Sequence, residues 1–174
     1  AGVKVFRIRP SGIAKSLKGR IFIHAHGGGH FMGGGIMAAR EGAMIAASSG
    51  IEVVSVDYTL STVSPFPAAL NDLVTVYQDL LSSFPGQFIA VGGSSAGGNL
   101  TLALVLRLKE LLVSLPGALF VGTPNADLLY TGDTIITNEY VDNTLPTVEG
   151  VNRAAAKLYA GDFDLKNPLI SPLY

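Results

Sequence analysis

The residues in this chain most able to do chemistry lie in a short motif of glycine and serine at residues 93–97 (GSSAG). The motif stands between a predicted strand at residues 87–91 and a predicted helix that starts near Gly98. A serine at the centre of G-x-S-x-G in this context sits on a sharp turn that exposes its hydroxyl. The turn would place Ser95 at a helix N-terminus, where backbone N–H groups favour developing negative charge. The motif therefore predicts a nucleophilic serine, and a phosphate-binding loop is the alternative it leaves open.

A second glycine-rich motif, at residues 26–29 (HGGG), directly follows a predicted strand at residues 20–25. Consecutive glycines let backbone N–H groups approach a bound group with no side chain in the way. In an acyl-transfer site these groups would bind an oxyanion together with the N–H of Ala96, the residue after Ser95. Alone, the motif could equally be a flexible loop. The two motifs in this order, each after a strand, indicate acyl transfer.

Alternating strands and helices must position these two motifs. Apolar and β-branched runs predict strands at residues 3–8, 20–25, 51–56, 87–91 and 115–121, and helical spacing predicts helices at residues 36–49, 67–81, 98–112 and 148–159. Strands that alternate with helices imply parallel βαβ units, with helices on both faces of a mostly parallel sheet. After Thr123 the sequence becomes polar and rich in turns. The expected fold class is therefore α/β.

The composition fits such a sheet and excludes several classes of protein. Of the 174 residues, 48% are hydrophobic and 14% are charged, which is enough apolar material for one buried core. The formal net charge of −1 gives no reason to expect binding to nucleic acid or to an anionic membrane. The absence of cysteine excludes disulfides, thiolate metal sites and a cysteine nucleophile.

One stretch without charged residues, at residues 80–106, is long enough to cross a bilayer. Proline and several glycines interrupt it, so a buried strand followed by a buried helix is the better interpretation, and no membrane span is expected. The sequence does not determine the cellular compartment, and a cytoplasmic location is the working expectation.

Taken together, the motifs resemble those of the hormone-sensitive lipase family of esterases and lipases, within the α/β-hydrolase superfamily. The similarity extends over nearly the whole chain. It rests on residues 26–29 (HGGG), 93–100 (GSSAGGNL), 57–58 with 65–72 (DY and PFPAALND), and 154–174. The resemblance implies an α/β-hydrolase fold that is incomplete at its C-terminal end, with a hydrolase core at residues 1–124, part of a helical cap at 125–160 and a connector back to the core at 161–174.

The family resemblance also implies roles for individual residues. Ser95 would be the catalytic nucleophile, and the N–H groups of Gly28, Gly29 and Ala96 would form the oxyanion hole. His26 would organise the glycine loop by hydrogen bonding. The implied reaction is the hydrolysis of small-molecule esters with short to medium acyl chains, with no cofactor and no metal.

Some positions depart from the family pattern. In the motif at residues 93–97, Ser94 stands where the family usually has Asp. The family segment that corresponds to residues 57–63 reads DYRLAPE, and its Arg, Pro and Glu are replaced here by Thr59, Thr62 and Val63. These changes remove charge near the site and are expected to alter the polarity of the substrate pocket or local packing. Ser94 is therefore a candidate substrate-binding residue.

The three histidines all precede Ser95 in the chain. His24 is expected to be a packed core residue, and His30 either lines the substrate pocket or is exposed to solvent. In this fold the catalytic acid and histidine follow the serine, so the acidic residues after Ser95 have no later histidine to orient. Asp127 is the most tempting of them, but a turn or capping role is the better interpretation.

The sequence therefore predicts that a C-terminal polypeptide outside these residues supplies the acid and the base. A homodimer is a further partner that the sequence allows. Two alternatives stay open: a catalytically inactive hydrolase-fold protein that binds a small molecule, and an inactive fragment whose role is to pair with another chain.

Overall fold

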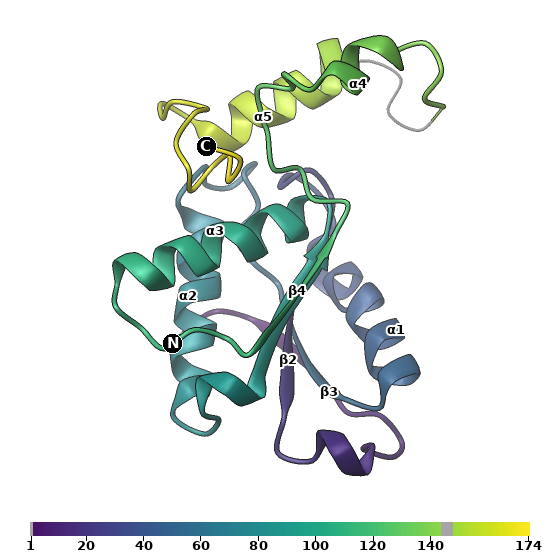
Figure 1. Ribbon diagram of the computed structural model, residues 1–174, viewed down its shortest axis with the longest axis vertical. Helices are drawn as coiled ribbons and strands as arrows, with labels where there is room; N and C mark the ends of the chain where they lie inside the picture. The colour runs from purple at the N-terminus through teal and green to yellow at the C-terminus, as the bar shows by residue number, and fades with distance from the viewer. Residues whose placement is uncertain (1, 144–147) are drawn as a thin grey trace.

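A computed structural model describes residues 2–143 and 148–174, and it shows a five-stranded sheet between helices (Figure 1). The strand order is β1-β3-β2-β4-β5. The strands are, in chain order, Val5–Ile8, Ile21–Ala25, Glu52–Val56, Ile89–Ser94 and Ala118–Gly122. β1 runs antiparallel to β3, and the other three pairings are parallel. The α/β class and the mostly parallel sheet predicted from the sequence are confirmed.

Helices cover both faces of this sheet, as the strand sequences require. α1 (Ala39–Ser49) packs on one face, and α2 (Ala68–Leu81) and α3 (Ala96–Glu110) pack together on the other (Figure 1). Side chains alternate between the faces along β2: Ile21 and Ile23 join the core under α2 and α3, whereas Phe22 joins the smaller core under α1. Burial on both faces explains the apolar runs of the central strands β2, β3 and β4, whereas the edge strands β1 and β5 are partly exposed.

The element boundaries differ from the predicted ones where glycine sets the local geometry. α3 starts at Ala96, two residues earlier than predicted, because Ser95 itself is the residue that caps the helix. β5 starts at Ala118 rather than at residue 115, because the chain at Gly117 crosses close to β4. A Cβ atom on Gly117 would lie 2.2 Å from the carbonyl oxygen of Gln87.

The segment after β5 contains more helix than the sequence pattern indicated. A short helix, α4 (Asp133–Thr137), lies inside the stretch interpreted as turns, of which residues 144–147 lie outside the described residues. The amphipathic segment at residues 148–159 is not one α-helix. It begins with a π-helical turn at Val148–Asn152, which contains Gly150 with φ 88°, and continues as α5 (Arg153–Ala160).

α4 and α5 form a separate layer beyond the carboxyl ends of the parallel strands (Figure 1). This layer is tied to the body of the molecule by the backbone N–H of Phe66, which donates to the carbonyl of Tyr159 at 2.7 Å. In the part of the chain that the structure describes, no helix is both long and apolar enough to cross a bilayer.

Candidate active site

Ser95 occupies a strained turn between β4 and α3. Its backbone angles are φ 55° and ψ −117°, which a residue other than glycine rarely adopts. The Ser95 N–H donates to the carbonyl of Gly122 at 2.8 Å, which ties the turn to the end of β5. A Cβ atom on Gly93 or on Gly97 would lie 1.9 Å from the carbonyl oxygen of Ala25. The glycines of GSSAG are therefore required because the turn lies directly against β2.

The HGGG loop lies beside this turn, because a Cβ atom on Gly27 would lie 3.1 Å from the carbonyl oxygen of Ser94. The His26 Nδ1 atom lies 2.7 Å from the carbonyl oxygen of Gly27, so this nitrogen carries the proton and donates. The His26 ring stacks on Tyr58 with ring centroids 4.0 Å apart, and the Tyr58 hydroxyl donates to the His26 carbonyl at 2.9 Å. Burial is the main cause that lowers the pKa of His26, so the ring is neutral near pH 7. These contacts connect His26 to the glycine loop and to Tyr58, just after β3.

Three backbone donors lie around the Ser95 turn without partners. Among the described residues, the N–H groups of Gly28, Gly29 and Ala96 donate no hydrogen bond. Ala96 is the first residue of α3, where the helix dipole adds partial positive charge. Gly28 has φ 116° and Gly29 has φ 59°, conformations that turn the loop and that glycine adopts most readily. Donors of this kind can stabilise negative charge on an oxygen of a bound group.

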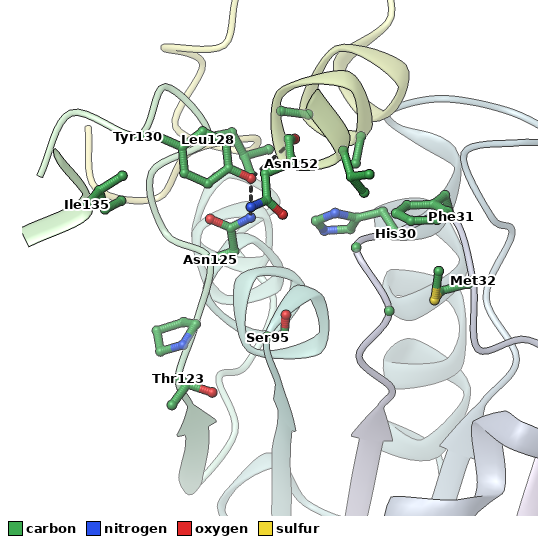
Figure 2. A pocket seen from close by; sticks show the side chains of 16 residues that line it. His30, Phe31, Met32, Ser95, Thr123, Asn125, Leu128, Tyr130, Ile135 and Asn152 are labelled. Atoms are coloured by element: carbon green, nitrogen blue, oxygen red, sulfur yellow. Dashed lines mark hydrogen bonds between the residues drawn. The ribbon is translucent and has the colours of Figure 1, made fainter. Parts of the chain in front are cut away.

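Gly28 and Gly29 line one cavity of about 450 Å³, which Figure 2 shows with Ser95 at its base, whereas Ala96, the residue after Ser95, is fully buried. Most of its wall is apolar. The lining residues come from the glycine loop, the Ser95 turn, the segment after β5, and the α4–α5 layer: Gly28, Gly29, His30, Phe31, Met32, Ser95, Thr123, Pro124, Asn125, Leu128, Tyr130, Ile135, Val151, Asn152, Ala155 and Ala156. An apolar cavity with a few convergent polar groups is the usual form of a small-molecule site.

A polar corner lies on the side of the cavity nearest to the α4–α5 layer. The Asn125 Nδ2 atom donates to the Tyr130 hydroxyl at 3.1 Å, and that hydroxyl donates to the carbonyl of Asn152 at 3.3 Å (Figure 2). The buried Asn99 of α3 is hydrogen bonded to this corner. Its Nδ2 atom donates to the carbonyls of Asn125 at 2.7 Å and Ile170 at 2.8 Å. The sequence analysis assigned no role to these asparagines.

His30 lines the cavity and is not exposed to solvent, which decides between the two alternatives left by the sequence. Only 2% of the residue is exposed, and its ring stacks on Tyr159 of α5 with centroids 3.7 Å apart. Within the described residues the His30 Nε2 atom has no hydrogen-bond partner. Burial lowers the pKa of His30 to about 4, with Asn99 and the Gly29 backbone acting in the opposite direction. The ring is therefore neutral at pH 7.

Replacing His30 should change how the unfolding free energy of the protein depends on pH. A histidine whose folded pKa is depressed stabilises the fold above its ordinary pKa of 6.5, and this stabilisation is lost as pH falls toward about 4. The wild-type protein should lose up to about 3 kcal/mol through this group between pH 6.5 and pH 4. In urea unfolding across this range, the unfolding free energy of wild type minus that of His30→Phe should fall by up to about 3 kcal/mol as the pH is lowered from 6.5 to 4. A constant difference would contradict this assignment.

Ser94 and His24 belong to a second group of polar side chains, on the α1 face of the sheet. Ser94 does not line the cavity, and its hydroxyl donates to a carboxylate oxygen of Glu41. His24 is fully buried, as predicted for a core residue, but it is also hydrogen bonded, with Nε2 3.0 Å from Glu41 Oε2 and Nδ1 2.7 Å from the Ser55 hydroxyl. The sequence analysis missed Glu41 because it lies 53 residues before Ser94.

Asp127 has the turn role that its sequence position suggested. Its carboxylate accepts hydrogen bonds from the N–H groups of Leu129 at 2.9 Å and Thr131 at 2.7 Å, and from the Thr131 hydroxyl at 2.7 Å. In the part of the chain described by the structure, no three histidine, aspartate or glutamate side chains are grouped so that they could hold a metal ion.

Comparison with known proteins places these features in a family. A family model described as alpha/beta hydrolase fold matches residues 22–174. An esterase of Acinetobacter venetianus is 31% identical over 177 residues, which cover 100% of this chain and 56% of the relative. An acetyl-hydrolase of Streptomyces hygroscopicus is 31% identical over 158 residues, which cover 90% of this chain and 52% of the relative. The chain thus spans about half the length of these curated relatives.

Solved structures agree with this placement. The crystal structure of esterase E25 is 46% identical with a TM-score of 0.95, over 99% of this chain and 53% of that one. A hormone-sensitive lipase from a metagenome library is 32% identical with a TM-score of 0.88, over 99% of this chain and 57% of that one. The predicted resemblance to the hormone-sensitive lipase family is confirmed, and the chain belongs to the alpha/beta hydrolase fold family.

Proposed function

We propose that this chain carries the nucleophile and the oxyanion hole of a carboxylic ester hydrolase. The observation that supports this most directly is that Ser95, Gly28 and Gly29 line one apolar cavity, with the N–H groups of Gly28, Gly29 and Ala96 unpaired among the described residues. A base would take the proton of the Ser95 hydroxyl as its oxygen attacks the ester carbonyl carbon. The carbonyl oxygen would become the oxyanion bound by the three N–H groups.

Collapse of this intermediate completes the first half of the reaction. The C–O bond to the alcohol breaks, the alcohol leaves with the proton held by the base, and the acyl group stays on Ser95. Water, deprotonated by the same base, then attacks the acyl carbon; the bond between this carbon and the Ser95 oxygen breaks, Ser95 regains the proton from the base, and the carboxylic acid is released. No cofactor or metal takes part in the proposed reaction.

The base and its acidic partner are proposed to come from polypeptide outside these 174 residues. His24 is hydrogen bonded to Ser55 and Glu41 on the α1 side of the sheet. His26 donates to Gly27 and stacks on Tyr58. His30 lines the cavity, but its pKa of about 4 makes it a weak base near neutral pH.

The sheet offers a place where such polypeptide could add. Within the described residues β5 pairs only with β4, and its side chains Leu119 and Phe120 are 43% and 46% exposed. A strand edge with unpaired backbone groups and exposed apolar side chains is a template for a further strand. A strand added there would lie near the carboxyl ends of β4 and β5, close to Ser95.

The proposed substrates are esters with short to medium acyl chains. A cavity of about 450 Å³ with a mostly apolar wall accommodates a chain of this kind. In this proposal residues 125–160 act as a cap that closes the cavity above Ser95, and residues 161–174 connect the cap back to the core. The α4–α5 layer supports the proposal, because Tyr130, Ile135 and Ala155 from this segment line the cavity.

Labelling of natively prepared protein with a fluorophosphonate probe tests this function. We expect one adduct, which peptide mass spectrometry maps to Ser95. An activated serine attacks the phosphorus of the probe, and the oxyanion hole binds the phosphoryl oxygen. The labelled species should exceed 18.1 kDa, or a second polypeptide should co-purify with it.

Two results would count against the proposal. A labelled single chain of 18.1 kDa would contradict the claim that other polypeptide supplies the base. Folded protein that takes no label would favour the alternative in which the cavity binds a small molecule without turnover, or in which this species is an inactive fragment.

A further inference from the structure

A row of hydrogen-bonded polar side chains connects the Ser95 turn to α1, the helix on the face of the sheet opposite to α3. The Ser94 hydroxyl donates to Glu41 Oε1, in the first turn of α1. The second carboxylate oxygen of Glu41 lies 3.0 Å from His24 Nε2. His24 Nδ1 lies 2.7 Å from the Ser55 hydroxyl, which donates to the carbonyl of Ala38 at 2.5 Å.

The sheet register brings these residues together. His24 of β2 pairs with Ser55 of β3 on one side and with Gly92 of β4 on the other. Ser94 lies two residues beyond Gly92, so its side chain projects from the same face as that of His24. Gly42 lets α1 approach this face, because a Cβ atom there would lie 3.3 Å from His24 Nδ1 and 3.2 Å from Val53 Cγ1.

The Ser55 hydroxyl determines the direction of one hydrogen bond in this row. A carbonyl oxygen only accepts, so the single Ser55 hydroxyl proton points to Ala38 and His24 Nδ1 must donate to Ser55. The His24 Nε2 and Glu41 Oε2 atoms lie 3.0 Å apart, within hydrogen-bond distance. The hydrogen bond from His24 is the main cause that lowers the pKa of Glu41; burial opposes it, and the hydrogen bond from Ser94 reinforces it.

We infer that Glu41 is a positioning residue for the nucleophile turn: its carboxylate, oriented by His24, holds the Ser94 hydroxyl and thereby the strained backbone of Ser95. A residue in a sparsely populated backbone conformation keeps it only where its neighbours enforce it. Ser95 is fixed on one side by α3, which starts at Ala96, and the Ser94–Glu41 contact fixes the residue before it. Glu41 is absent from the walls of the substrate cavity, so it does not contact substrate there.

This inference rests on the proposed function and is tested by a double-mutant cycle in the whole, natively assembled protein. The rate constant for fluorophosphonate modification of Ser95 should fall about tenfold or more in Glu41→Ala and in Ser94→Ala, because small displacements of a reacting group are costly. The double variant should be slower than the slower single variant by no more than about twofold, because both changes break the same contact.

Conservative variants separate positioning from a general effect of substitution. In Glu41→Gln the amide oxygen can still accept from Ser94 and the amide NH₂ can donate to His24 Nε2, so we expect a rate within about threefold of wild type. Ser94→Thr keeps the hydroxyl and should behave in the same way. With a p-nitrophenyl acyl ester, kcat should fall in Glu41→Ala while KM stays unchanged, because Glu41 lies outside the cavity.

Glu110→Gln is the matched control. Glu110 ends α3 on the surface, where it pairs with Arg107, and the same substitution there should leave the rate unchanged. Additive effects of about hundredfold in the double variant, or a Glu41→Gln rate as low as that of Glu41→Ala, would overturn the inference. If Glu41→Ala does not fold, Ser94→Ala and Ser94→Thr decide: a wild-type rate in Ser94→Ala overturns it.

The outcomes also distinguish this inference from the proposed function on which it rests. Wild-type protein that takes no label on Ser95 would overturn the proposed function. Wild-type protein that is labelled, with Glu41→Ala and Ser94→Ala labelled at the same rate, would overturn only the positioning role of Glu41.

Discussion

A Gly97→Ala variant should lose about 4 kcal/mol or more of unfolding free energy, which is most of the stability of a domain near the lower end of the usual range of about 5–15 kcal/mol. Gly97 lies in the first turn of α3, where alanine has the higher helix propensity and would by itself stabilise the helix by about 1 kcal/mol. Packing against β2 makes the overall change in unfolding free energy destabilising instead. A Cβ atom would lie 1.9 Å from the carbonyl oxygen of Ala25 and 2.9 Å from that of His26.

Neither of these atoms can move aside. Ala25 ends β2, which is paired with β3 and β4 on its two sides, so relief would require α3 to separate from the middle of the sheet. The measurement is soluble yield together with the urea midpoint of any folded protein. Gly12→Ala is the matched control, because a Cβ atom there meets nothing within 4 Å, and its stability should change by no more than about 0.5 kcal/mol. A Gly97→Ala midpoint equal to that of Gly12→Ala would show that the contact can relax.

Gly97 also illustrates what could be predicted from the sequence. Its motif indicated a crowded turn between a strand and a helix, because G-x-S-x-G requires glycine where a side chain would collide with neighbouring backbone. The alternation of apolar runs and helical spacing predicted all five strands and the α-helices between them, and the apolar signal is strongest in the central strands, which are buried on both faces. Boundaries were less predictable: the start of α3 at Ala96 depends on the tertiary position of the turn.

The rest of the site depends on contacts between residues far apart in the chain. Glu41 reaches Ser94 across 53 positions, and Asn99 reaches the Ile170 carbonyl across 71. Neither residue stands in a pattern whose spacing predicts the contact, because the contact exists only after the sheet and the last segment are in place. The burial of His30 likewise depends on Tyr159 of α5, which stacks on it. Local spacing predicted the proposed nucleophile and oxyanion-hole residues, and tertiary packing supplies the side chains that contact their turns.

A Gly28→Ala variant should lower the rate of Ser95 acylation by about 10²- to 10³-fold, the usual effect of losing an oxyanion-hole donor. Gly28 has φ 116°, and a Cβ atom there would lie 2.3 Å from the carbonyl oxygen of Met32. The turn cannot open without breaking the hydrogen bonds that Phe31 and Met32 donate to the Gly28 carbonyl, at 3.1 and 3.0 Å. The Gly28 and Gly29 N–H groups would then move away from Ser95. The measurement is the pre-steady-state burst with a p-nitrophenyl ester.

Gly35→Ala separates this effect from backbone strain alone. Gly35 follows the same loop and has φ 67°, so alanine there carries a comparable conformational cost of about 1 kcal/mol, but its Cβ atom would meet nothing within 4 Å. Its N–H would still donate to Asp57 Oδ1, which lies 2.8 Å away. We therefore expect Gly35→Ala to be less stable than wild type yet acylated at the wild-type rate. Equal burst rates in Gly28→Ala and Gly35→Ala would mean that the glycine loop does not bind the oxyanion, and that the stabilising donors lie elsewhere around Ser95.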